Sequence, residues 1–270
     1  MSFLLTIITI NYNNFNGLKK TIKSVLSQNF NDFEYIIIDG GSTDGSKELI
    51  ENVSDRLSYW ICEKDTGIYN AMNKGINAAT GNYIQFLNSG DALANKNVLK
   101  YISEKIRGTN DQYDFYYTDV INQHNNEIIF YPKQLTFRHF FDLTINHQAT
   151  FFKKELFEKY GNYSEHYKIV SDWEFYMKIL FLHNVSYMHL NEPSVSFDFS
   201  EGISTSPNFT KLMNEERSDV LKKYFANFIE DYIFFKKMLS SNTWKILQKI
   251  IKIKSKIVLK TRPLNFFHKS

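Results

Sequence analysis

The amino-acid sequence predicts an α/β fold, in which a mostly parallel central sheet is flanked by helices and followed by a helical C-terminal appendage. Four apolar segments, separated by three segments of helical periodicity, occupy residues 4–87, and each ends abruptly in small polar residues. Strand–loop–helix units that repeat in this way form parallel sheets with right-handed crossovers. Residues 232–270 contain ten Lys or Arg and no Asp or Glu, which sets the end of the chain apart.

The first half of the chain contains the regular repeats. We expect strands at residues 4–10, 34–38, 57–62 and 83–87, and helices at residues 17–28, 46–52 and 68–79. Because the carboxyl ends of parallel strands meet at one edge of a sheet, the polar loops that follow the strands should meet there too. We therefore expect Asn11, Asp39, Asp65 and Asp91 to converge, although they are far apart in the sequence.

The second half is less regular. We expect a helix at 97–107, strands at 113–118 and 128–131, a short strand after residue 150, a helix from residue 153, a helix at 171–182, a strand at 185–189 and a long helix ending near residue 239. A loop rich in Gly, Ser and Pro at 201–208 precedes the long helix. We therefore expect two domains, residues 1–207 and residues 208–270.

Composition excludes several classes of protein. Hydrophobic residues make up 43% of the 270-residue chain, which is enough to bury a sizeable core. The single cysteine, Cys62, excludes an internal disulfide and suits a reducing compartment. Outside the basic tail, 22 basic residues stand against 29 acidic ones, which argues against a nucleic-acid-binding core. We also expect neither a signal peptide nor a transmembrane helix.

Two aspartates that follow predicted strands are candidate ligand-binding residues. Asp91 lies on a glycine-containing turn where a hard cation could meet ligand phosphates, although it could instead cap the next helix. Asp39 could accept hydrogen bonds from a nucleobase or ribose, or it could stabilise its own turn. The glycines at 40, 41 and 45 do not match the dinucleotide fingerprint G-x-G-x-x-G, and the Walker lysine is absent. A Rossmann dehydrogenase or a P-loop enzyme is therefore disfavoured.

Several segments, taken in order, resemble the motifs of glycosyltransferase family 2: TIITINYN at 6–13, SVLSQ at 24–28, DGGSTDG at 39–45 and NSGD at 88–91. The segment EKDTGIYNAMNKG at 63–75 resembles the branch that builds bacterial capsule, colanic-acid-type and lipopolysaccharide chains. The likeness covers about residues 3–205. It implies the GT-A fold, which is a nucleotide-sugar-binding α/β domain.

The resemblance also implies which side chains bind the donor. Tyr12 would offer a stacking face to the nucleobase, and Asp39 would read the uracil or ribose. Asp65 would lie near the base or near a cation such as Lys74. The whole implied donor-binding set is Thr9, Asn11, Tyr12, Asp39, Asp65, Lys74, Asn88 and Ser89.

A divalent metal ion is implied as well. The family usually has D-x-D or D-D after the fourth strand, but this chain has Asn88 and Gly90 where acids are common. Asp91 is the surviving acid and the implied ligand of Mn²⁺ or Mg²⁺. With one carboxylate, the diphosphate must supply much of the coordination, as it does for many Mg²⁺ sites. The cation would neutralise charge on the departing nucleoside diphosphate.

Family members often carry Glu-Asp at the start of a helix on the far side of the sugar. Asp172 occupies that place and resembles the general base, with Glu174 as the second candidate; a plain N-cap with first-turn acids is the alternative. His147 and Gln148 resemble an H-Q element that would touch the diphosphate, the metal or the acceptor, although a structural histidine fits equally well. The loop around Ser204 could close over substrate.

The basic tail is expected to contact a membrane. Lysines at 245, 249, 252, 256 and 260 share one face of a helix over residues 244–260, which suits an anionic membrane surface or, alternatively, a solvated helix packed on the domain. The implied protein is an inverting transferase, because direct displacement assisted by the base inverts the anomeric centre. The absence of the Q-x-x-R-W signature of processive enzymes favours transfer of a single sugar. It would use a nucleotide-sugar donor, in particular a UDP-sugar, and a saccharide or polyprenyl-linked acceptor in bacterial surface polysaccharide biosynthesis.

The expected location is the bacterial cytoplasm, at the inner face of the cytoplasmic membrane. Two other functions stay open: a sugar-nucleotide nucleotidyltransferase, which shares the α/β base-binding layout, and an inactive nucleotide-sugar-binding or scaffold protein. The first usually has a G-x-G-T-R-L-type loop after its first strand, and this chain does not. The second is suggested by Asn88 and Gly90, which stand where family members commonly have acidic residues.

Overall fold

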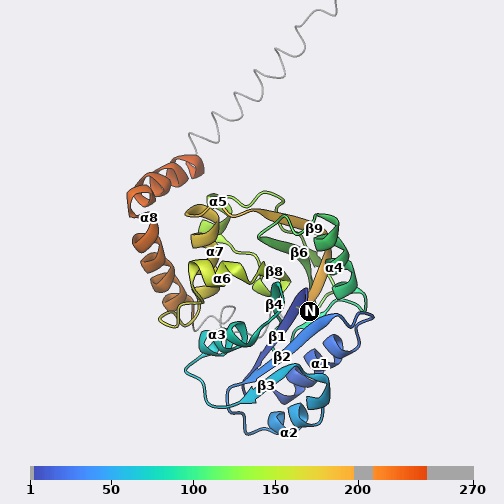
Figure 1. Ribbon diagram of the computed structural model, residues 1–270. Helices are drawn as coiled ribbons and strands as arrows, with labels where there is room; N and C mark the ends of the chain where they lie inside the picture. The colour runs from blue at the N-terminus through green and yellow to red at the C-terminus, as the bar shows by residue number, and fades with distance from the viewer. Residues whose placement is uncertain (1–2, 198–208, 242–270) are drawn as a thin grey trace, which may run out of the picture. The chain divides into compact units, whose positions relative to one another are not determined.

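The computed structural model describes residues 3–197 and 209–241. Within these residues nine strands form one sheet in the order β3-β2-β1-β4-β8-β6-β9-β5, and β7 pairs with β6 (Figure 1). Helices lie on both faces of the sheet. The α/β fold class predicted from the sequence is confirmed.

The first half of the sheet is entirely parallel. It consists of β1 (Leu5–Asn11), β2 (Phe33–Asp39), β3 (Tyr59–Cys62) and β4 (Tyr83–Phe86), connected by α1 (Phe15–Leu26), α2 (Ser46–Glu51), the 3-10 turn η1 (Ser54–Arg56) and α3 (Ile68–Ala78). β1 pairs with β2 and β4, and β2 pairs with β3, all in parallel. The side chains of β1 and β2 are buried because both faces are covered, as is usual in parallel sheets.

The second half of the sheet is mixed. Its strands are β5 (Ala92–Leu93), β6 (Phe115–Asn122), β7 (Ile128–Ile129), β8 (Thr150–Lys153) and β9 (Tyr187–Phe197). Its helical elements are α4 (Val98–Gly108), α5 (Phe137–Asp142), the 3-10 turn η2 (His147–Ala149), α6 (Glu155–Tyr160) and α7 (Ser171–Phe181). β8 runs antiparallel to both β4 and β6, whereas β6 and β9 are parallel. Parallel pairing is therefore concentrated in the first four strands.

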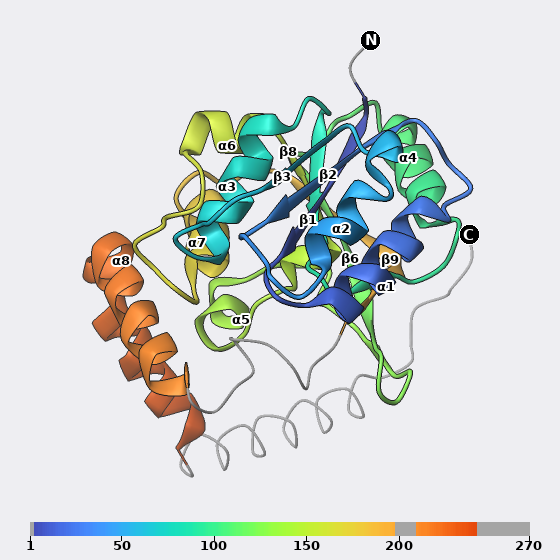
Figure 2. The ribbon, with the colours of Figure 1, turned by 90° about the horizontal axis from the view of Figure 1, so that it is seen from below.

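The two faces of the sheet are covered by different helices. In two views, α1, α2 and α4 lie on one side and α3, α6 and α7 lie on the other (Figure 1 and Figure 2). Leu5 and Ile7 of β1 pack with Leu18 and Ile22 of α1 in the large core cluster. On the opposite face, a Cβ on Gly75 would lie 2.5 Å from Cγ2 of Ile8. Only glycine therefore allows α3 to approach β1 this closely.

β4 and β8 separate before they reach the edge where the parallel strands end. Their register joins Tyr83 to Lys153 and Ile84 to Phe152, but the last two residues of β4 have no partner in β8. The turn η2 fills this space, and Nε2 of Gln85 donates to the carbonyl oxygen of Gln148 at 2.7 Å. The sheet thus places His147, the first residue of η2, beside the loop that follows β4.

The chain divides into two compact units, residues 1–217 and 218–270. The predicted boundary after residue 207 stays a prediction. Helix α8 (Thr210–Ser240) begins in the first unit and has a non-helical residue, Phe225, within it. In the ranges 3–197 and 209–241, no helix has the length and apolar character that are needed to cross a membrane.

Candidate active site

Asn11 and Asp39 are paired in register at the carboxyl ends of β1 and β2. Nδ2 of Asn11 donates to Oδ2 of Asp39 at 2.7 Å. The backbone N–H groups of Gly41 and Ser42 donate to Oδ1 at 3.0 and 2.8 Å, and the hydroxyl of Ser42 donates to Oδ2 at 2.7 Å. The carboxylate therefore organises the loop that follows β2, which is the turn role that the sequence left open for it.

The environment of Asp39 keeps it ionised. Burial raises its pKa, but hydrogen bonds from Cys62, Asn11 and Ser42 outweigh burial and hold the pKa below its ordinary value. The Cys62 thiol lies 3.0 Å from Oδ1. Asp39 has no exposed surface in this structure, so any effect on a ligand is exerted through the loop that it shapes.

The loop after β3 packs against the loop after β2. A Cβ on Gly40 would lie 2.4 Å from Oδ2 of Asp65 and 3.2 Å from the ring of Tyr12, so these three residues meet. Tyr12 is 67% exposed, so its ring can stack on a ligand. Nζ of Lys74 pairs with Oε1 of Glu63, two residues before Asp65, at 2.7 Å.

Thr9 requires a correction. It has no exposed surface, and its hydroxyl lies 3.1 Å from the hydroxyl of Tyr35 inside the core. Adjacent strand residues point to opposite faces of a sheet, so position in the motif did not determine which side chain reaches the site. Thr9 therefore contributes to packing behind the site and does not line it.

The loop after β4 is held by α1. Oγ1 of Thr21 accepts from the N–H of Gly90 at 3.0 Å and lies 2.7 Å from the carbonyl oxygen of Asp91. Nζ of Lys20 donates to the carbonyl oxygen of Gly90 at 2.8 Å, and Nδ2 of Asn14 donates to that of Ser89 at 3.1 Å. Gly90 has a φ of 107°, which favours glycine at this position. The loop is thus rigidly attached to the sheet edge.

This loop offers oxygen ligands for a cation. Oδ1 of Asn88 is a buried oxygen atom with no hydrogen-bond partner, and Asp91 is nearly buried three residues later. Hard oxygen atoms are the ligands that Mg²⁺ and Mn²⁺ prefer. In the part of the chain that the structure describes, no three His, Cys, Asp or Glu side chains group as a metal site. The donor set therefore fits a cation whose coordination is completed by phosphate oxygens.

Asp172, in the first turn of α7, lies at the centre of a polar network. Oδ2 is 2.9 Å from Nδ1 of His147, and Oδ1 is 3.0 Å from the hydroxyl of Tyr69 in α3. Nε2 of His147 lies 3.4 Å from Nδ2 of Asn88, so the network reaches the loop after β4. The side chain of Asp172 is 18% exposed and that of His147 is 11% exposed, so both keep access to solvent.

The charge state of Asp172 follows from these contacts. Burial raises its pKa, but the hydrogen bond and charge of His147, together with the Tyr69 hydroxyl, lower it below the ordinary value. An ionised carboxylate only accepts hydrogen bonds, so Nδ1 of His147 carries the proton and Nε2 presents a lone pair when the ring is neutral. Glu174, the second candidate base, is 3% exposed and lies deeper than Asp172.

The structure brings most of the predicted residues to one edge of the sheet. The loops after β1, β2, β3 and β4 meet through Asn11–Asp39, Gly40–Asp65 and Asn14–Ser89. Gln148 is buried and acts through its backbone. Ser204 and the segment 244–260 lie outside the described residues.

Sequence reasoning missed three residues that support the site: Tyr69, Cys62 and Thr21. Each reaches its partner across the fold, from positions 23 to 103 residues away in the chain. In the sequence Tyr69 is one aromatic residue in an amphipathic helix, and Thr21 is one polar residue in another. The sequence pointed to Tyr69 in one way only: Tyr69 lies within the family-like motif at residues 63–75.

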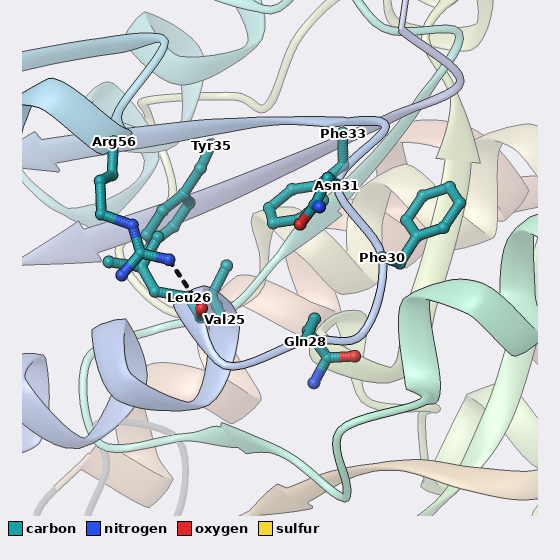
Figure 3. Close-up of a pocket in the computed structure, with 8 residues that line it drawn as sticks. All are labelled: Val25, Leu26, Gln28, Phe30, Asn31, Phe33, Tyr35 and Arg56. Carbon is teal, nitrogen blue, oxygen red and sulfur yellow. Dashed lines mark hydrogen bonds between the residues drawn. The ribbon is translucent and has the colours of Figure 1, made fainter.

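A pocket of about 210 Å³ lies at the opposite edge of the sheet (Figure 3). Phe33 and Tyr35 line it from the beginning of β2, and Nη2 of Arg56 donates to the carbonyl oxygen of Leu26 at 2.8 Å across it. The candidate site is at the carboxyl end of β2. The pocket is therefore separate from the network of Asp172.

Comparison with known proteins agrees with this arrangement. The family model described as glycosyl transferase family 2 matches residues 6–164. The chain belongs to this family. It is a glycosyltransferase, as the motif order led us to expect.

Relatives and solved structures extend the comparison. The chain is 34% identical to a PGL/p-HBAD biosynthesis glycosyltransferase of Mycobacterium tuberculosis over 58% of its own length and 62% of that relative. S. aureus TarS 1–349 in complex with UDP-GlcNAc has a TM-score of 0.65 at 19% identity, covering 81% of this chain and 66% of that one. The mannosyltransferase PcManGT from Pyrobaculum calidifontis, in complex with GDP-Man and Mn²⁺, has a TM-score of 0.58 at 12% identity, covering 92% and 84%. These likenesses confirm the GT-A fold.

Proposed function

We propose that this glycosyltransferase moves a single sugar from a nucleotide-sugar donor, in particular a UDP-sugar, to a saccharide or polyprenyl-linked acceptor. The observation that carries the proposal is the continuity of the sheet edge: Asn88 of the loop after β4 lies 3.4 Å from His147, which pairs with Asp172. A donor whose diphosphate lies on that loop would have its anomeric carbon near Asp172. A relative named for PGL/p-HBAD biosynthesis and structures titled with UDP-GlcNAc and GDP-Man support this assignment.

The nucleoside would lie over the loops after β1, β2 and β3. Tyr12 supplies an exposed ring for stacking on the base, and Asn11 and Asp65 line the same edge. Asp39 fixes the loop from beneath, so that its backbone groups keep one geometry. Ser89 presents a small polar side chain where the diphosphate would pass, and Gly90 leaves room for close approach.

A single displacement accounts for the chemistry. The acceptor hydroxyl oxygen attacks the anomeric carbon, the bond to the diphosphate oxygen breaks, and the nucleoside diphosphate leaves with the electron pair. Asp172 takes the hydroxyl proton, with His147 and Tyr69 fixing its orientation. Attack opposite the leaving group inverts the anomeric centre, so no covalent nucleophile is needed. Asn88 and Asp91 would hold Mn²⁺ or Mg²⁺, which supplies positive charge to the departing diphosphate when bound.

The acceptor and the cellular location are part of the proposal. Phe228, Phe234 and Phe235 in α8 are 66%, 64% and 53% exposed, and Lys236 and Lys237 lie on the same helix. Exposed aromatic and basic side chains together suit an anionic membrane surface. Contact through this helix and through residues 244–260 would bring a lipid-linked acceptor of bacterial surface polysaccharide to the cytoplasmic face of the membrane.

A nucleotide thermal-shift screen with and without Mn²⁺, followed by transfer assays with radiolabelled UDP-sugars, tests the proposal. We expect one nucleoside diphosphate to raise the melting temperature, because a ligand that binds only the native state stabilises it. We also expect Asp91→Ala to abolish both Mn²⁺-dependent stabilisation and transfer. Nucleotidyl transfer from a nucleoside triphosphate to a sugar phosphate would support the alternative enzyme class, and tight donor binding without turnover would support a binding protein. Either result would overturn the proposal.

A further inference from the structure

Glu216, in the second turn of α8, binds the backbone that leads into α7. Its carboxylate accepts from three successive N–H groups: Lys168 at 2.8 Å, Ile169 at 3.0 Å and Val170 at 3.3 Å. The residue is 8% exposed, so these bonds are shielded from water. The cap residue of α7, Val170, makes no side-chain cap bond of its own. Glu216 therefore accepts from the N–H of the cap residue of α7 and from the two N–H groups that precede it, and it fixes the segment by which the chain enters the helix.

The same peptide segment touches the network of Asp172 from its other side. The carbonyl oxygen of Ile169 lies 2.6 Å from the hydroxyl of Tyr69, and that hydroxyl lies 3.0 Å from Oδ1 of Asp172. A tyrosine hydroxyl has one proton, so Ile169 and Asp172 compete for it. The position of the Ile169 carbonyl thus sets how strongly Tyr69 can donate to Asp172.

The Tyr69 hydroxyl can donate to either of these two acceptors, and this choice matters in the proposed reaction. When Asp172 is ionised, Tyr69 donates to it. When Asp172 has taken the proton of the acceptor hydroxyl, Tyr69 can donate to Ile169 instead and accept from the protonated carboxyl group. Both states are then fully hydrogen-bonded, provided that the segment 168–170 stays in place.

Arg217, the residue after Glu216, attaches the same helix to α7 and to the end of α5. Its guanidinium lies 5.0 Å from the centroid of the Trp173 ring and donates to the carbonyl oxygen of Asp142 at 3.3 Å. Trp173 is the neighbour of Asp172 in sequence. The beginning of α8 therefore contacts the backbone just before α7 and Trp173 within α7, on both sides of Asp172 in the sequence.

From these contacts we infer that Glu216 is a positioning residue for the Asp172–Tyr69 pair, acting through the backbone of residues 168–170. The inference rests on the proposed function, because it assigns Glu216 to the proton transfer of that site. It also explains why an acidic residue is buried at the beginning of a helix whose adjacent acid, Glu215, is 61% exposed and pairs only with Lys211 among the described ion pairs.

Glu216→Gln tests the inference, because glutamine keeps the size of the side chain and removes its charge. We expect kcat to fall about tenfold or more while the donor KM changes by less than about twofold, since only a transition-state interaction is lost. Glu215→Gln is the matched control and should leave both constants unchanged. Rates should be measured well below the melting temperature of each variant, so that a folding defect cannot imitate the effect.

Amide hydrogen exchange gives a readout that does not depend on turnover. We expect the N–H groups of residues 168–170 to exchange faster in Glu216→Gln than in Glu215→Gln, with the amides of α7 itself little changed. If wild-type protein transfers sugar from no donor, the proposed function fails, and exchange together with the side-chain NMR signal of His147 still tests the link to Asp172. Unchanged kcat, unchanged exchange, or parallel losses of kcat and donor affinity in Glu216→Gln would overturn the inference.

Discussion

Nδ1 of His147 lies 2.9 Å from Oδ2 of Asp172, and this pair joins the turn before β8 to the first turn of α7. The two side chains come from segments 25 residues apart, yet each keeps some access to solvent. Because the other ring nitrogen faces Asn88, one continuous set of polar contacts runs from the loop after β4 to the proposed base. Substitutions of Asp172, His147 and Asn88 therefore each test one member of this set of contacts.

Asp172→Asn should abolish sugar transfer without abolishing donor binding. The amide cannot take a proton from the acceptor hydroxyl, and loss of a general base costs about 10²- to 10⁴-fold in rate. Initial rates with a labelled donor measure the loss, and the thermal shift caused by the nucleotide measures donor binding. Transfer at more than a tenth of the wild-type rate would exclude Asp172 as the base.

His147→Ala should move the acid limb of the pH–rate profile to higher pH. Burial raises the pKa of Asp172, and the hydrogen bond and charge of His147 lower it; without the imidazole the pKa rises. Because the base must be ionised to act, activity is then lost at a higher pH as the solution is acidified. The profile of kcat/KM measures this limb, and a limb that moves to lower pH would contradict the assigned cause.

Asn88→Asp should strengthen the response to Mn²⁺. The substitution places a carboxylate where Oδ1 of Asn88 is buried without a partner, and carboxylates bind hard cations more tightly than amides do. The melting temperature in UDP should rise more on addition of Mn²⁺ than it does for wild type, and EDTA should reverse the gain. Asn31→Asp, an exposed position at the opposite edge of the sheet, serves as the control. An equal response in the two variants would refute the metal assignment.

Thr21→Val should destabilise the protein by about 0.5–1.5 kcal/mol, since it removes the hydrogen bond to a partly buried N–H. Valine has nearly the same shape as threonine, but the Gly90 N–H, 3.0 Å from Oγ1, then has no partner there. Urea denaturation measures the free energy of unfolding, and Thr21→Ser, which keeps the hydroxyl, should lose much less. If serine and valine lose equally, packing and not the hydrogen bond holds the loop.

Cys62 should resist alkylation. Burial first, and then the hydrogen bond to Asp39 and its charge, raise the pKa of the thiol from 9.0 to about 11. The thiolate is the reactive form. A pKa that is two units higher reduces the thiolate population about 100-fold at pH 8. Mass spectrometry after iodoacetamide treatment should show slow modification of the native protein and fast modification in urea. Asp39→Asn should react faster than wild type, and an equal rate would indicate that burial alone protects the thiol.

The fold was predictable where local pattern determines it. The segments that became β1, β2 and β4 are apolar and bounded by polar turns, and their order implies a parallel sheet with polar loops at one edge. The antiparallel direction of β8 was not predictable. Hydrophobic periodicity shows that a segment forms a strand, but it does not show which strand it pairs with or in which direction. The detailed extent of β9 was also missed, since only its first residues were recognised as strand-like.

The site was predictable as a set of loops and not as a set of contacts. The register of Asn11 with Asp39 follows from parallel pairing, and it places both residues where the motif suggested. The Lys74–Glu63 ion pair and the burial of Thr9 depend on side-chain direction, which the motif does not contain. Tyr69 and Glu216 act through partners 103 and about 47 residues away, so no local window could show them.

The early separation of β4 and β8 leaves one wall of the site without a strand. There the 3-10 turn beginning at His147 occupies the place of the missing strand pairing, and it is held by Gln85 through the carbonyl oxygen of Gln148 and by Asp172 through His147. A substitution in this turn breaks few cross-strand bonds, so folding tolerates it better than a change within the sheet. Its first side chain, His147, nevertheless pairs with the proposed base Asp172, so we expect substitutions at this position to alter acceptor preference with little loss of folding stability.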